Sequence, residues 1–301
     1  MSKITAALKK DQMEDINIHH SARFADANYS GIQLIARFME DHSKMIEGVF
    51  PRKAEGYRDA AIQGLWFRAF AWMQSLEHLN SARHFQAISA GLRALLEMTV
   101  DLILLHHDKS NGLGWKIQQW GTSERMKAAE QVVSFYQDRG PIPDEYTPQE
   151  TFYRNEKSIV DHMRRSLWPK KDPTKAEHPQ RWTGSPNLFV DIERADQLYG
   201  VEIEKQIGCS LEEYYRTRYR QINWQIHSGV AAFRGVPPEG FHVLVGLTFK
   251  ECADLAMLCT KIVLTDFGLS SALPNFTAAW EALKQQRGQA YIEIMTSGPK
   301  D

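Results

Sequence analysis

The residues best suited to chemistry lie on one predicted helix, residues 210–233, which is rich in arginine and tyrosine. Arg220 and His227 are seven residues apart, so their side chains lie within about 20° of each other on one helical face. Arginine holds phosphate oxygens with a planar fork of donors, and histidine exchanges protons near neutral pH. The pair therefore suits a phosphodiester. The alternative is a solvated arginine face beside a hydrogen-bonded core histidine.

A second polar group lies on the helix predicted for residues 82–107. Arg93 and Glu97 are four residues apart, so they can form an exposed intrahelical ion pair. Because this helix is otherwise strongly apolar, the pair can also be buried, where it needs partners that offset desolvation. With Asp101 one turn further along, these residues could form a polar pocket that faces the helix of His227.

A basic segment precedes the arginine-rich helix. Residues 151–181 contain eight Lys or Arg and four Asp or Glu. Prolines and a glycine predict a long loop near residues 168–186. Such a loop, carrying Trp168 and Trp182, can hold single-stranded RNA by charge and stacking, or it can be an ordinary exposed loop. The expected substrate-binding residues are Arg93, Glu97, Trp182, Arg216 and Asn223.

Several familiar chemistries are absent from the sequence. It has no glycine-rich nucleotide loop and no Gly-x-Ser-x-Gly nucleophile turn. The Glu-x-x-His run at Glu239 begins in a Pro-Gly turn, and neighbouring histidines such as His106 and His107 point about 100° apart on a helix. Cys252 and Cys259 share one face of an apolar helix, so we expect them in the core. We therefore expect no metal site and no cofactor.

The elements that position these residues are predicted to be helices, because apolar residues recur at helical spacing and alternating strand patterns are scarce. We predict an all-α, multi-helix antiparallel bundle in one domain over residues 1–301, with residues 1–55 as an N-terminal helical extension and 56–290 as the bundle core. Pro51, Asn111-Gly112 and Gly200 are expected to mark helix ends, and Ser210 is expected to cap a helix. The predicted helices cover residues 29–50, 57–79, 82–107, 123–139, 148–167, 186–199, 210–233, 241–267 and 275–287.

Charge and composition narrow the cellular setting. The chain has 36 Lys or Arg and 37 Asp or Glu, a net charge of −1, which argues against a dedicated DNA-coating protein. Three cysteines without Cys-x-x-Cys spacing fit a reducing compartment. The N-terminus lacks an apolar signal core, and charges interrupt the most apolar stretch, residues 241–267. We expect a cytoplasmic protein that does not enter the membrane.

The motifs together resemble the HEPN superfamily. Arg220 and His227 fit its Arg-x(4–6)-His pattern at the longest spacing, with Gln221 in place of the Asn, Asp or His that commonly follows the arginine. The wider arrangement is similar to a group of uncharacterised bacterial helical proteins placed near that superfamily. It consists of Arg93-Ala94-Leu95-Leu96-Glu97, then Arg181-Trp182-Thr183-Gly184, then the tyrosine-rich helix that ends in His227-Ser228, and it covers roughly residues 82–265.

The resemblance implies an antiparallel helical core, a homodimer and metal-independent cleavage of RNA at the dimer cleft. Carried over, Arg220 would stabilise the phosphate, and His227 would act as general acid or base on the 2′-hydroxyl or the leaving oxygen. It also implies a toxin or a phage-defence protein, with an antitoxin or other partner protein. Many HEPN-like proteins lack activity, so the alternative is a non-catalytic module that binds a partner protein or small ligand through the same cleft.

Overall fold

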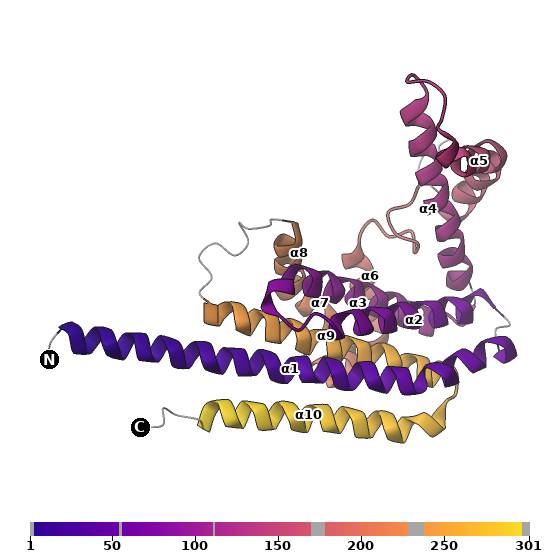
Figure 1. Ribbon diagram of the computed structural model, residues 1–301. Coiled ribbons are helices and arrows are strands. Elements are labelled where there is room, and N and C mark those ends of the chain that lie inside the picture. Colours follow the sequence, from indigo (N-terminus) through magenta and orange to yellow (C-terminus); the bar gives the residue numbers. More distant parts are fainter. Residues whose placement is uncertain (1–2, 54–55, 111, 170–177, 228–237, 297–301) are drawn as a thin grey trace.

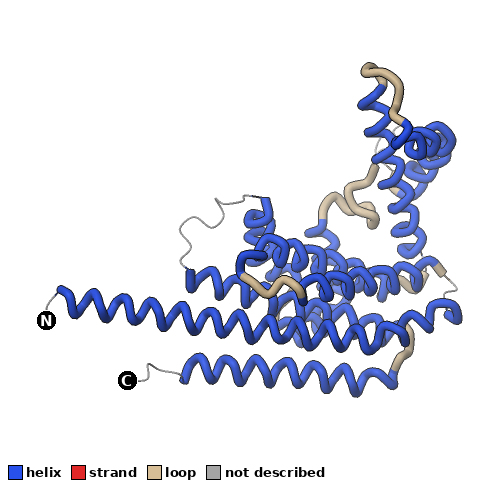
Figure 2. The backbone as a smooth tube through the Cα atoms, in the orientation of Figure 1, coloured by secondary structure: helices blue, strands red, loops and turns tan. Residues whose placement is uncertain are grey.

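The regular structure of the chain is helical. The computed structural model describes residues 3–53, 56–110, 112–169, 178–227 and 238–296, and within these ranges it contains no strand (Figure 2). This confirms the predicted all-α class. The elements are α1 (Lys3–Lys53), α2 (Tyr57–Glu77), α3 (Phe85–His106), α4 (Gly112–Tyr136), α5 (Thr147–Leu167), α6 (Leu188–Ile207), α7 (Leu211–Tyr214), a π segment (Tyr215–Tyr219), α8 (Arg220–His227), α9 (Pro238–Asp266) and α10 (Leu273–Thr296), with 3-10 turns at Ala82–His84, Asp144–Tyr146 and Ser270–Ala272.

Helix α9 forms the centre of the bundle, because it packs against α1, α2, α3, α6 and α10. Helices that follow one another, such as α1 and α2 or α9 and α10, run antiparallel as predicted (Figure 1). In contrast, α1 and α3 run in the same direction as α9, although both pack directly against it. Cys252 and Cys259 of α9 are fully buried, as expected for core cysteines.

Residues 1–55 were expected to extend from the bundle, but the structure shows that much of α1 belongs to the core. Ile32, Ile35 and Met39 are fully buried. The helix can approach α9 closely because Gly246 has no side chain: a Cβ there would lie 2.6 Å from Cδ1 of Phe24. The helix also continues past Pro51 to Lys53.

Three helix ends near the candidate site show how local residues begin or end a helix. Ser210 was predicted to cap a helix, and its Oγ accepts a hydrogen bond from the Glu213 N–H at 3.0 Å. Helix α6 does not end at Gly200 as expected, but continues to Ile207 and ends at Gly208, whose φ is +85°. Its start is capped by Asn187, which accepts from the Val190 N–H at 3.2 Å.

Helices α4 and α5 pack against each other and project from the bundle as an arm, residues 112–167 (Figure 1). Helix α4 starts at Gly112 and not near residue 123, so Gly112 begins a helix, while Asn111, the other residue of the expected end signal, lies outside the described residues. At its base, α4 touches α2 so closely that a Cβ on Gly114 would lie 2.3 Å from the backbone nitrogen of Arg58.

No helix in the described part of the chain is long and apolar enough to cross a membrane. Helix α9, residues Pro238–Asp266, is rich in apolar residues. Its charged residues, including Glu251 and Asp254, form ion pairs with Arg218 and Arg287. These pairs compensate the charges within the protein, which is the arrangement of a core helix.

Candidate functional site

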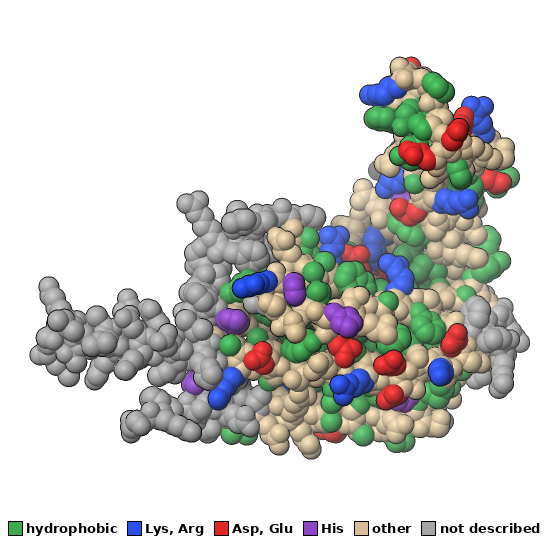
Figure 3. Space-filling model, in the orientation of Figure 1, with side chains coloured by type: hydrophobic (Ala, Val, Ile, Leu, Met, Phe, Trp, Pro, Cys, Tyr) green, Lys and Arg blue, Asp and Glu red, His purple; other side chains and the backbone are tan. Residues whose placement is uncertain are grey.

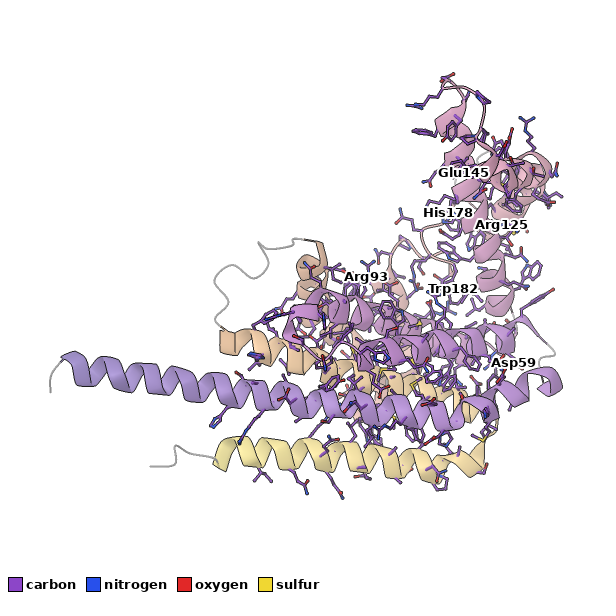
Figure 4. The ribbon with its side chains drawn as sticks, viewed as in Figure 1. Asp59, Arg93, Arg125, Glu145, His178 and Trp182 are labelled. Carbon is purple, nitrogen blue, oxygen red and sulfur yellow. The ribbon has the colours of Figure 1, made fainter. Side chains whose placement is uncertain are left out.

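A polar stripe runs along α3, whose other side chains are mostly buried in the bundle. Arg93, Glu97 and Asp101 follow one another at intervals of four residues, so they share one face. Arg93 Nε donates to Glu97 Oε1 at 2.9 Å, and the two side chains are 39% and 32% exposed. The intrahelical pair predicted from the spacing is therefore present at the edge of the core, next to α8 (Figure 4).

Tyr219 connects this pair to the arginine-rich helix. Its hydroxyl donates to Glu97 Oε1 at 3.0 Å, although the two residues are 122 positions apart. Burial and the Glu97 charge raise the pKa of Tyr219 to about 12, so it remains a neutral donor at physiological pH. Asn223 also hydrogen-bonds Tyr219, and its Oδ1 is buried without a hydrogen-bond partner among the described residues. The sequence predicted Arg93, Glu97 and Asn223 as site residues, but it gave no sign that Tyr219 joins them.

The three arginines near this network have different surroundings. Arg220, the first residue of α8, is exposed and makes no ion pair with another described residue. Arg216 is also exposed, but it pairs with Glu212 at 2.8 Å and its guanidinium lies 4.6 Å from the ring centre of Phe189 on α6. Arg218 is held by Glu251 of α9 at 2.8 Å. Arg220 is thus the arginine most available to a ligand.

The π segment lies immediately before Arg220. Its wider turn has the i→i+5 bonding of a π-helix, a feature that occurs frequently at functional sites. Within it, the rings of Tyr215 and Tyr219 stack with their centres 4.8 Å apart, and Tyr215 also packs against Phe189. The segment therefore fixes the direction in which α8 leaves, and with it the position of Arg220.

His227 ends α8, and its side chain lies outside the described residues. The expected pairing of His227 with Arg220 therefore stays a prediction. The helical backbone from Arg220 to His227 is described, so the two residues are on one short helix as the sequence indicates.

Trp182 was expected to stack on RNA, but the structure places it in the interior. Its side chain is only 3% exposed, and its carbonyl accepts a hydrogen bond from Trp168 Nε1 at 2.8 Å (Figure 4). Trp168 is itself 5% exposed. The expectation that Trp182 stacks on RNA is wrong, because neither tryptophan ring presents a face on which a base could stack. Loop composition did not reveal that both tryptophans pack inward.

The residue before Trp182 is equally fixed. Arg181 donates through Nη2 to Asp101 Oδ1 at 2.6 Å and through Nε to Asp191 Oδ2 at 2.9 Å. Asp191 is fully buried and also accepts from Thr183 and Ser185. Burial raises the pKa of Asp101 to about 6, although Arg181 opposes this shift. Asp101 therefore anchors the loop to α3 and is not available as part of an open pocket.

The basic segment is partly neutralised inside the protein. Arg164 is 2% exposed, with Nε donating to Ser123 Oγ at 2.8 Å and Nη1 to Glu130 at 3.1 Å. Arg181 is bound as described above, and Lys170, Lys171 and Lys175 lie outside the described residues. In the view of Figure 3, positive and negative side chains alternate over the arm and the bundle. The expected basic loop therefore contributes less free charge than its composition indicates.

The described residues contain no group of three or more His, Cys, Asp or Glu that could hold a metal ion. The adjacent histidines at the end of α3 have other contacts. His106 Nδ1 lies 3.0 Å from Asp266 Oδ2, and Asp266 also accepts from Arg58 at 2.6 Å. His107 packs its ring against Tyr199. These contacts account for the pair as parts of the α3–α6–α9 junction.

Comparison with known proteins identifies one family. The model of a family of unknown function, DUF5677, matches residues 59–236, which is more than half of the 301 residues. The match runs from α2 to the end of α8 and includes Arg93, Glu97, Tyr219 and Arg220, but neither α1 nor α9. No curated protein and no solved structure matches the chain. The chain belongs to the DUF5677 family, and the polar network between α3 and α8 lies within the part that the family shares.

Proposed function

We propose that the face formed by α3 and α8 binds RNA and cleaves it without a metal ion. The observation that carries the proposal is the position of Arg220. It is exposed, has no ion-pair partner among the described residues, and directly follows a π segment that is tied to the Arg93–Glu97 pair through Tyr219. An arginine that is held in place by its backbone and free at its guanidinium is suited to bind a phosphate.

Each residue has a distinct role in this proposal. Arg220 binds the phosphate and stabilises the charge that develops on it, and His227 transfers the proton of the 2′-hydroxyl or of the leaving oxygen. Glu97 and Tyr219 are positioning residues, because their hydrogen bond joins α3 to the turn before α8. Asn223 and the partly exposed Arg93 lie beside them and contact the ribose or a neighbouring phosphate.

The setting of this activity follows from the resemblance to HEPN proteins and belongs to the same proposal. The protein acts in the cytoplasm as a homodimer in which the α8 helices of two copies face one cleft. It is a toxin or a phage-defence ribonuclease whose activity a partner protein, such as an antitoxin, holds in check. The exposed side chains of Arg216 and Arg220 are compatible with a cleft between two copies.

The first experiment measures RNA cleavage by purified protein in the presence of EDTA. We expect the wild type to cleave, and His227→Ala and Arg220→Ala to reduce the rate by about 10²-fold or more, as is typical when a proton-transfer group or an oxyanion donor is lost. Arg154→Ala is the matched control, since Arg154 is an exposed arginine on the arm that pairs with Glu150. Circular dichroism confirms that all four proteins are folded.

Two outcomes would contradict the proposal. Equal cleavage by the wild type and both site variants would assign the activity to another site. Absence of cleavage together with Arg220-dependent binding of a protein or small ligand would support the alternative, a non-catalytic binding module. Glu97→Leu gives an independent check: it should lower activity without removing a substrate contact, and an unchanged rate in a folded variant would exclude the positioning role of Glu97.

A further inference from the structure

A pocket lies where the arm joins the bundle, away from the α3–α8 face. Four elements converge on it: the end of α3, the start of α4, the end of α5 and one face of α6. Its volume is about 470 Å³, which is within the range of small-molecule sites. The residues that line it are Leu104, His107, Asp108, Ser110, Gly112, Leu113, Trp115, Lys116, Leu167, Arg194 and Leu198.

The walls of the pocket are largely apolar and partly open to solvent. Leucines from all four elements contribute, and Trp115 and Leu198 are 37% and 39% exposed. The Trp115 ring is braced by Tyr57 of α2, with their centres 4.8 Å apart. Large apolar side chains that remain exposed around a concave site favour an apolar ligand body, because binding removes their surface from water.

The charged groups of the pocket favour an anion. Lys116 and Arg194 form no ion pair with another described residue. The single carboxylate among the lining residues, Asp108, is already bound: it accepts from the Ser110 N–H and hydroxyl and from the Leu113 N–H. These bonds lower the pKa of Asp108 and direct its charge to the start of α4. Asp108 stays charged, but its oxygens are occupied by these donors, so the lining keeps two cations against one carboxylate and an excess of positive charge.

His107 supplies one further polar group. Its Nε2 is buried and has no hydrogen-bond partner among the described residues. Burial and the neighbouring His106 lower the pKa of His107, so the ring is neutral at physiological pH. A buried ring nitrogen without a partner in the wall of a pocket can be satisfied by a polar atom of a ligand.

We propose that this pocket binds a small amphipathic anion, a carboxylate or sulfonate on a compact apolar body. The head group pairs with Lys116 and Arg194, and the apolar body lies among Leu104, Leu113 and Leu167. A free small molecule is the occupant, since the volume accommodates one such body and four elements enclose it. The inference stands apart from the proposed ribonuclease, because no residue of the pocket belongs to the α3–α8 face.

The test uses the fluorescent anion anilinonaphthalene sulfonate on the full-length wild-type protein. We expect saturable binding that decanoate displaces. Decyltrimethylammonium and decanol have the same chain but a positive or neutral head, so they should displace the dye at least about fivefold less well, because they cannot form charge-assisted hydrogen bonds with the two cations.

Variants locate the site. Lys116→Ala with Arg194→Ala should weaken dye and decanoate binding about tenfold, which corresponds to the loss of about 1.4 kcal/mol. Leu198→Asp should abolish binding by placing a charge in the wall. Lys205→Ala is the matched control. Lys205 is an exposed lysine on α6, the helix of Arg194, but it lies outside the pocket, so this variant should bind the dye as the wild type does. Unchanged thermal unfolding of each variant confirms its fold.

Three results would overturn the inference: no saturable binding of the dye to the folded wild type, equal displacement of the dye by decanoate, decyltrimethylammonium and decanol, or full dye binding by the Lys116→Ala/Arg194→Ala variant. The second would show an apolar pocket without selection for charge. The third would place the dye elsewhere on the protein. None of these outcomes depends on whether the protein cleaves RNA.

Discussion

At the residue scale, Asp101 illustrates how a buried carboxylate is controlled by opposing effects. Burial disfavours its charged form, the nearby Asp191 and Glu97 do the same, and Arg181 and Trp182 favour it. The result is a pKa of about 6 in the folded protein, against an ordinary value of 3.8. The folded state therefore binds more protons than the unfolded state between these two values.

The free energy of unfolding should consequently contain a component that falls as the pH rises from about 4 to about 6, with a slope of at most about 1.4 kcal/mol per pH unit. Asp101→Asn removes this component. The free energy of unfolding of the wild type minus that of the variant should therefore be higher at pH 4.5 than at pH 7. Urea unfolding at both pH values measures it. Asp144→Asn, an exposed carboxylate on the arm, serves as control. Parallel pH profiles for wild type and Asp101→Asn would contradict the assignment.

The candidate site could be read from the sequence only where the signal is local. The spacing of Arg93 and Glu97 gives their ion pair directly, because both residues lie on one helix. Tyr219 could not be assigned to Glu97, since their contact depends on how α3 and α8 cross. The burial of Trp182 was missed for the same reason. A loop rich in proline and charge indicates exposure, whereas packing against distant helices decides it.

At the element scale, the π segment is the feature that sets α8. Its side chains contact two neighbours at once: Arg218 reaches Glu251 of α9, and Tyr219 reaches Glu97 of α3. Thr217 lies on the solvent side of the segment and is exposed. Removing one residue here would restore the tighter i→i+4 pattern of an α-helix.

Insertion of an alanine after Thr217, by contrast, adds a residue that the π turn does not absorb, and it should rotate everything after it by about 100° relative to α3 and α9. Ile222 and Tyr219, which are 2% and 5% exposed, would leave their sites. We expect a loss of roughly 2–5 kcal/mol in the free energy of unfolding, as for other core losses, together with loss of RNA cleavage. Chemical unfolding and the cleavage assay measure the two effects. Thr217→Ala keeps the register and should change neither by much; an insertion variant with full stability would argue against the role given to the segment.

Most helices could be predicted from the sequence. The errors lie in the predicted helix ends, where local signals alone do not decide. Periodicity and the Ser210 cap are local, and both are found in the structure. The end of α6 was placed at Gly200, but a glycine within a helix costs only about 1 kcal/mol, which packing against α3 and α9 offsets. The first part of α1 lacks a strong apolar stripe in the sequence, so the bounded helix predicted there began at residue 29, within a helical extension of residues 1–55, whereas α1 begins at Lys3.

At the scale of the whole molecule, the arm meets the bundle in a close contact between α4 and α2. Gly114 of α4 lies against the backbone of α2, where a Cβ would be 2.3 Å from the Arg58 nitrogen and 2.5 Å from its Cα. Because backbone atoms cannot give way as a flexible side chain can, any larger residue must move the arm. The pocket proposed to bind an amphipathic anion lies at this same junction.

Gly114→Ala should lower the free energy of unfolding by several kcal/mol, roughly the cost of severe overpacking or more. The matched control is Gly121→Ala on the same helix, where a Cβ meets nothing within 4 Å. That change should stabilise the protein by roughly 0.5–1 kcal/mol, because alanine favours the helix. Thermal unfolding of both variants gives the comparison. If the two alanines had the same effect, the close contact between arm and bundle would be refuted.

The pairing of α1 with α9 has a consequence for how the chain is made. Ile32, Ile35 and Met39 of α1 leave the ribosome early, but α9, to which α1 packs, begins only at Pro238. At about 5–20 residues per second, the apolar face of α1 is without α9 for roughly 10–40 s of synthesis. The arm needs no such delay, since α4 and α5 are close in sequence and pack on each other. Translation therefore completes the arm before the contact between α1 and α9, which lies at the centre of the bundle.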